Sequence, residues 1–169
     1  IASILACAML LSAAPVEAMA YTVPDTVRVG LESVCKNVAS ASIGVWELQI
    51  GMQKGDGFQR GGVITSSGLF TARPAVGDYI AVDKTMDCAD ALDMANDMKK
   101  SGLDTYAAYL SGGDWTVYVK DASVSAVEAA ADENASRVSF EGVAITGGEA
   151  PVLVPENAVM MGGNVADTF

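Results

Sequence analysis

The pattern of apolar and polar positions between Tyr79 and about Phe140 predicts six consecutive elements. Short alternating stretches indicate strands, and apolar residues recurring every three or four positions indicate helices. In chain order we expect a strand at 79–83, a helix at 87–100, strands at 103–110 and 115–119, a helix at 125–134 and a strand at 137–143. This order predicts an α+β fold, with an antiparallel sheet that carries two helices on one face.

Local signals mark the ends of the two expected helices. Asp87 is suited to cap the first, Gly102 to stop it, and Ser125 and Glu128 have the spacing of a capping box in the second. The two halves echo each other in their apolar positions, which favours an internal duplication of a strand–helix–strand unit. We assign this duplicated domain to residues 78–145.

A β-rich unit is expected before it, over residues 21–77. Several short alternating stretches and Gly-rich turns lie there, and Pro74 and Gly77 mark the boundary. Trp46 and Phe58 are expected in its core. We expect residues 146–169 to be the start of a further domain or a tail.

The first twenty residues resemble a secretory signal peptide whose basic region is missing. An apolar run ends in a small–x–small cleavage pattern at Ala18 and Ala20. The alternative is a buried N-terminal helix. We therefore expect an exported protein of the cell envelope or the extracellular space, and a sequence that is a fragment at both ends.

Two cysteines, Cys35 and Cys88, remain after the expected cleavage. In an exported chain such a pair permits one disulfide, and two unpaired thiols are the alternative. The chain has no histidine, which excludes a Ser–His–Asp triad, a Cys–His pair and a His-ligated metal. We expect no catalytic residue, no cofactor and no metal in this stretch.

The net charge of −11 limits the partners that the chain can have. It disfavours nucleic acid, whose phosphates require Lys and Arg, and also anionic membranes. Acidic residues gather around the first helix, at Asp83, Asp87, Asp90, Asp93 and Asp97. A solvated acidic face explains them, and the calcium alternative lacks the Asp-x-Asp-x-Asp-Gly motif.

The duplicated region resembles a SPOR (sporulation-related repeat) domain. The resemblance covers about sixty residues and rests on the following positions: Ile80, Val82, Ala91, Met94, Ala95, Met98, Gly102, Gly112, Gly113, Trp115, Val117 and Val119. It implies a bacterial domain that binds septal peptidoglycan, with a preference for glycan strands stripped of their peptides.

A second resemblance concerns the order of the whole chain. The stretch Val27-Arg-Val-Gly-Leu31, followed by a Gly-Phe hairpin and the SPOR-like repeat, is similar to the N-terminal part of SpoIID/LytB-type proteins of Gram-positive bacteria. That family implies a following catalytic domain, either a lytic transglycosylase or a stimulator of a wall amidase. No residue of this chain is assigned a catalytic role.

The candidate binding residues lie on the sheet face away from the expected helices. If helices cover Ile80, Val82, Val117 and Val119, alternation sends Ala81, Asp83, Thr116 and Tyr118 to the open face. Tyr106 joins them if Leu103, Thr105 and Ala107 face inward. The two tyrosines offer stacking platforms for sugar rings, and Asp83 and Thr116 offer hydrogen bonds. The alternative is the ordinary solvated side of a sheet.

These observations predict an exported module that binds peptidoglycan glycan strands and places a wall-remodelling or sporulation activity on them. The first alternative is the N-terminal fragment of a SpoIID/LytB-type enzyme or enhancer. The second is a protein–protein interaction module at the cell envelope, with other cell-wall or division proteins as partners.

Overall fold

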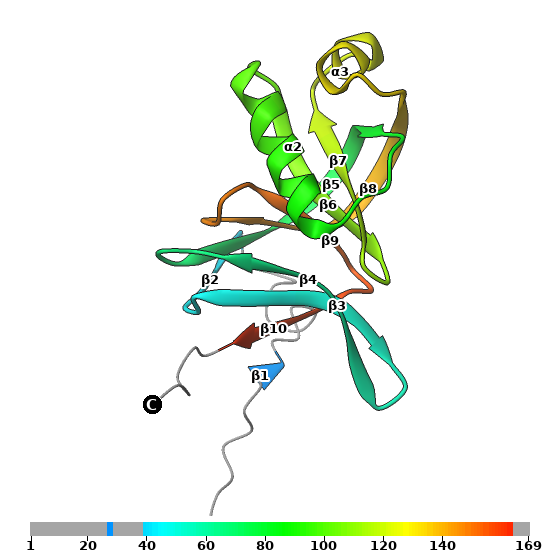
Figure 1. Cartoon of the computed structure of the whole chain (residues 1–169). Helices are drawn as coiled ribbons and strands as arrows, with labels where there is room; N and C mark the ends of the chain where they lie inside the picture. The colour runs from blue at the N-terminus through cyan, green and yellow to red at the C-terminus, as the bar shows by residue number, and fades with distance from the viewer. Residues whose placement is uncertain (1–26, 29–38, 164–169) are drawn as a thin grey trace, which may run out of the picture.

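The computed structural model describes residues 27–28 and 39–163 and is a mixed α+β structure of two sheets and two helices (Figure 1). The fold therefore confirms the α+β class. The elements are β1 (Val27–Arg28), β2 (Ala41–Ile43), β3 (Glu47–Lys54), β4 (Gly57–Thr65), β5 (Phe70–Val82), α2 (Cys88–Lys100), β6 (Asp104–Ser111), β7 (Asp114–Lys120), α3 (Val124–Ala131), β8 (Ala135–Thr146), β9 (Val152–Pro155) and β10 (Val159–Gly163).

The smaller sheet has four antiparallel strands in the order β1-β10-β3-β4. The hairpin of β3 and β4 forms most of it, with a register shift at Ile50 and Gly51. Strand β10, near the C-terminal end of the described chain, lies between β1 and β3. The sheet is thus built from both ends of the chain, and Figure 1 shows it below the larger sheet.

The larger sheet curls into a five-stranded, barrel-like arrangement. Strand β5 pairs with β7 and β8, β7 pairs with β6, and β9 joins β6 to β8, which closes the circuit. The expectation of an antiparallel sheet holds for every pair but one, because β9 runs parallel to β6. By pairing with both β6 and β8, β9 also joins the two ends of the sheet. A SPOR-like arrangement is not shown by these pairings.

Both helices pack on the outer face of this sheet (Figure 1). The four strand residues that the sequence places beneath them share one buried cluster with Ala91, Ala95 and Met98 of α2 and Val127 of α3. Asp87 caps α2 as expected, since its carboxylate accepts the N–H of Asp90 at 2.9 Å. The capping box expected at Ser125 is wrong: α3 begins earlier, and the hydroxyl of Ser123 accepts the N–H of Ala126.

Strand β5 runs without interruption through the boundary that the sequence places at Pro74 and Gly77. Pro74 and Gly77 both lie inside β5, where they pair with Val143 and Phe140 of β8. Strands β9 and β10 of the expected tail lie within the two sheets. The division into domains stays a prediction.

The two sheets meet at the outer edge of β4. The indole Nε1 of Trp115 donates to the carbonyl of Gly61 at 2.9 Å, and the Cys88 thiol donates to the carbonyl of Val63 at 3.6 Å. A side chain at Gly62 would meet Trp115 at 2.6 Å and the Cys88 sulfur at 2.8 Å, so only glycine permits this close approach.

Neither aromatic residue expected in the core of the β-rich unit is buried there, and Phe58 is only partly buried. Trp115 is fully buried between the two sheets, whereas Trp46, which we expected in the core, is 63% exposed. The reason is local: Trp46 lies in the short connection between β2 and β3, outside the alternation that buries Leu48 and Ile50.

Candidate functional site

An aromatic cluster occupies the inner face of the barrel-like sheet, opposite the helices. We define it as Tyr79, Tyr106, Tyr118 and Phe140, which come from β5, β6, β7 and β8. The Tyr79 ring lies 6.0 Å from the rings of both Tyr106 and Tyr118 and 5.9 Å from Phe140, measured between centroids. Edge-on and tilted contacts of this kind stabilise aromatic groups beyond their buried area. The cluster is therefore a packed unit and not a set of separate surface residues.

Tyr106 and Tyr118, both predicted site residues, are direct cross-strand partners in this cluster. Each is half-buried, so part of each ring reaches solvent. The phenol of Tyr106 donates to the Asp104 carboxylate at 3.3 Å. Burial, together with the nearby Asp104, raises the pKa of Tyr106 to about 12, and burial raises the pKa of Tyr118. Both phenols thus stay protonated at neutral pH and can donate hydrogen bonds.

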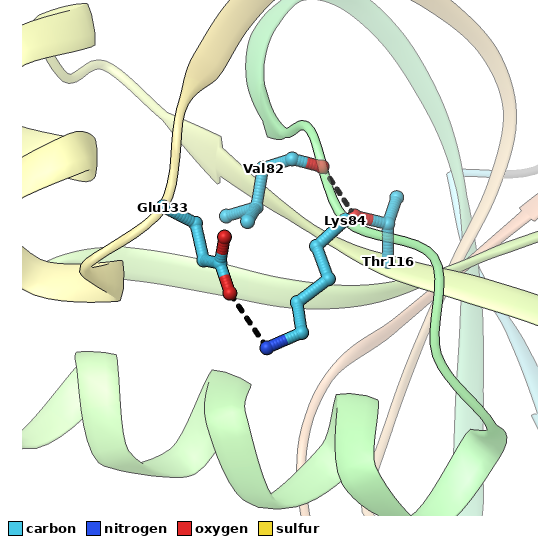
Figure 2. A network of polar contacts seen from close by, with 4 residues as sticks. All are labelled: Val82, Lys84, Thr116 and Glu133. Carbon is cyan, nitrogen blue, oxygen red and sulfur yellow. Dashed lines mark hydrogen bonds and ion pairs between the residues drawn. The ribbon is translucent and has the colours of Figure 1, made fainter.

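The other two predicted site residues lie beside the end of β5, and the structure uses both in its own hydrogen bonds. Thr116 is only 4% exposed, and its hydroxyl donates to the carbonyl of Val82 at 2.7 Å (Figure 2). Asp83 is exposed and accepts a hydrogen bond from Ser136 at 2.7 Å. Asp83 is accessible to a ligand, whereas Thr116 is enclosed and holds the end of β5 in place.

A salt bridge lies next to this strand end. The Lys84 amine is 2.6 Å from the Glu133 carboxylate, which joins the segment after β5 to the segment after α3 (Figure 2). The backbone N–H of Asp83 also donates to the carbonyl of Asn134 at 2.8 Å. These contacts hold in place the segment after β5, which carries Asp83.

Sequence reasoning missed three residues of this face. Tyr79 is the hub of the aromatic cluster, Phe140 packs against two of its rings, and Lys120 is the cross-strand partner of Asp104. Alternation could have identified two of them. Tyr79 is two positions from Ala81, and Lys120 is two positions from Tyr118, so each shares a sheet face with that residue. The pairing of β5 with β8, which brings Phe140 in, depends on residues far apart in the chain.

The cysteines and the cleavage residues are the remaining candidates from the sequence. Cys88 has no disulfide partner among the described residues, and burial raises the pKa of its thiol to about 11, which makes it a poor nucleophile at neutral pH. Its expected partner Cys35 lies outside the described residues, so the disulfide stays a prediction. The cleavage residues Ala18 and Ala20 also lie outside them.

The described part of the chain offers neither a metal cluster nor a membrane-spanning helix. In residues 27–28 and 39–163 no three His, Cys, Asp or Glu side chains gather as a metal ion would need. No helix in the described part of the chain has the length and apolar character to cross a membrane.

A shallow hollow lies on the exposed side of α2, lined by Asp93, Asn96, Asp97, Lys99 and Lys100. It is formed by one helix and is separate from the aromatic cluster.

Comparisons with known proteins give no relative for this chain. No protein-family model, no curated protein and no solved structure matches it. The site must therefore be interpreted from its own chemistry.

Proposed function

We propose that this chain is an exported module that binds the glycan strands of peptidoglycan through the aromatic cluster. The observation that carries the proposal is the cross-strand pair Tyr106 and Tyr118, half-buried on a sheet face that no helix covers. Sugar rings present apolar C–H faces that stack on aromatic rings, and two neighbouring tyrosines offer a platform of that kind.

Polar groups around the tyrosines suit a sugar ligand. The protonated phenols donate hydrogen bonds, and the carboxylates of Asp83 and Asp104 accept them from sugar hydroxyls. Lys120, beside Asp104, offers a cation to the lactyl carboxylate that a stripped glycan strand retains. This local cation offsets part of the repulsion from the net charge of −11.

We also propose that residues from β5 to β8 form a SPOR-like repeat. Support comes from the order β5, α2, β6, β7, α3, β8 and from the position of both helices on one face. The closing strand β9 is an addition to that pattern. The proposed role in the intact protein is to hold a wall-remodelling or sporulation activity on its substrate.

A protein–protein interaction module is the second candidate, and a different surface favours it. Trp46 and Leu69 are 63% and 61% exposed, and both lie near the loop that holds Gly44, far along the chain from the tyrosines. Exposed large apolar side chains that gather at one place are typical of protein contacts.

A binding assay on purified peptidoglycan sacculi, with and without amidase treatment, tests the two candidates. We expect the full chain to be retained more strongly after the peptides are removed. Replacing both tyrosines, Tyr106→Ala and Tyr118→Ala, should raise the concentration for half-retention about tenfold, because the stacking platform is lost. Phenylalanine at both positions should preserve most retention, since the rings remain.

Trp46→Ala is the matched control, an exposed aromatic residue outside the cluster. It should leave retention unchanged if the tyrosines bind the glycan. Retention that survives the tyrosine changes but is lost with Trp46→Ala contradicts the proposed site. No retention on either preparation contradicts glycan binding and favours the interaction module.

A further inference from the structure

The first half of β8 has a free edge. Strand β8 pairs with β5 along its full length, from Ala135 to Thr146, on one side. On its other side β9 pairs only with Gly142 to Ile145. Among the described strands, residues 135–141 of β8 therefore have no ladder partner on that side. Their outward N–H and C=O groups offer hydrogen bonds to another strand.

Side chains along this edge divide cleanly between the two sheet faces. Arg137, Ser139 and Glu141 are exposed, and their alternation with Val138 and Phe140 places them on the outer face. Val138 and Phe140 point to the inner face, where both pack in or against the aromatic cluster. The exposed positions thus carry one cation and one anion, each two residues from Ser139.

This arrangement is complementary to itself. We propose that a second copy of this chain pairs antiparallel with β8, with Ser139 opposite Ser139 at the twofold axis. Residues opposite each other in such a pair lie close together on the same face. Arg137 of each copy then faces Glu141 of the other, twice by symmetry. On the inner face Val138 meets Phe140, so that apolar side chains also meet apolar side chains.

Neighbouring registers lack this match. A pairing centred on Val138 sets Arg137 against Ser139 and Glu141 against Ala135, which leaves both charges without a partner. A pairing centred on Phe140 requires Gly142 and later residues, which β9 already occupies. The Ser139 register is the one in which both charges pair and the edge is free.

The dimer should be weak and should depend on concentration. The ladder is short, from Arg137 to Glu141, and each copy carries a net charge of −11 that repels the other. The specificity comes from the opposed charges and not from a large buried area. Sedimentation equilibrium of the full chain at physiological salt, over a wide concentration range, measures this association directly, since the monomer mass is 17.4 kDa.

Charge exchange at two positions tests the register. Arg137→Glu places like charges opposite each other twice and should raise the dimer dissociation constant about tenfold. The double variant Arg137→Glu, Glu141→Arg restores the opposite pair in reversed order and should recover the original value. Arg60→Glu, an equal charge change at an exposed position on β4, is the control and should leave dimerisation nearly unchanged.

Circular dichroism of each variant verifies that the fold is retained. A wild-type dimer that Arg137→Glu weakens and the double variant restores supports the proposal. A monomer at every concentration overturns it. A dimer that Arg137→Glu leaves intact, or that the double variant fails to restore, also overturns it, because a different surface then forms the contact.

Discussion

The two strand–helix–strand halves of the larger sheet have the same order of elements but contribute unequally to the core. Helix α2 has 13 residues and buries Ala91, Leu92, Ala95 and Met98, whereas α3 has 8 residues and buries Val127. The hydroxyl of Thr105 also donates to the carbonyl of Ala95 at 2.6 Å, which attaches α2 to β6. The similar patterns in the sequence thus conceal a difference in packing.

The reason for this difference lies outside the repeat. The first residue of α2, Cys88, reaches β4 of the smaller sheet, so α2 lies where both sheets meet. Helix α3 packs on β5 and β8 of the larger sheet, away from that junction. The comparison shows that a duplicated pattern predicts the order of the elements. How many core residues each helix buries depends on neighbouring elements outside the pattern.

The largest effect is expected at the junction with the smaller sheet. Gly62→Ala would place a carbon 2.6 Å from Trp115 and 2.8 Å from the sulfur of Cys88. We expect a loss of about 3 kcal/mol in the free energy of unfolding, because these two side chains are held in place and must shift. Urea unfolding measures it. Gly68→Ala is the control, because nothing lies within 4 Å of that position; an equal loss there would contradict the explanation.

A smaller effect is expected within the two helices. Met98→Ala in α2 should cost about 2.5 kcal/mol, and Val127→Ala in α3 about 2 kcal/mol. The order follows from the larger side chain of Met98, since both residues are buried in the same cluster. Urea unfolding of both variants measures the two losses. A larger loss at Val127 would reverse the comparison between the halves.

The smallest effect concerns the caps. Asp87→Ala and Ser123→Ala each remove one side-chain acceptor at a helix start and should each cost about 1 kcal/mol. We expect Asp87→Ala to lower global stability and Ser123→Ala to act mainly on α3, where one buried residue holds the helix. Amide hydrogen exchange distinguishes these results. Equal loss of protection throughout the protein in both variants would contradict the local role of α3.

The sequence predicts those features of the structure that depend on residues close together in the chain. The expected helix at 87–100 matches α2 closely, because Asp87, the apolar stripe and Gly102 are all local signals. Tyr106 and Tyr118 are also expected on one face of the sheet, and the hairpin of β6 and β7 pairs them there. The α+β class is predicted correctly from these elements alone.

The closure of the sheet could not be predicted in this way. Strand β9 forms it by pairing with β8, the strand just before it, and with β6, which is distant in the chain. The same closure explains why Thr116, expected on an open face, is enclosed, while Asp83 at the strand end stays exposed. Pro74 and Gly77 indicate a boundary, but both lie inside β5, whose pairing with β8 joins residues about seventy positions apart.

Chemical-shift mapping by NMR, with peptide-stripped glycan chains added to the labelled full chain, tests the central claim most directly. The account predicts that the largest shifts fall on Tyr106, Tyr118 and their neighbours Asp104 and Lys120 on the inner face of the sheet. Shifts that centre on Trp46 and Leu69, or no shifts at saturating glycan, would contradict glycan binding at the aromatic cluster.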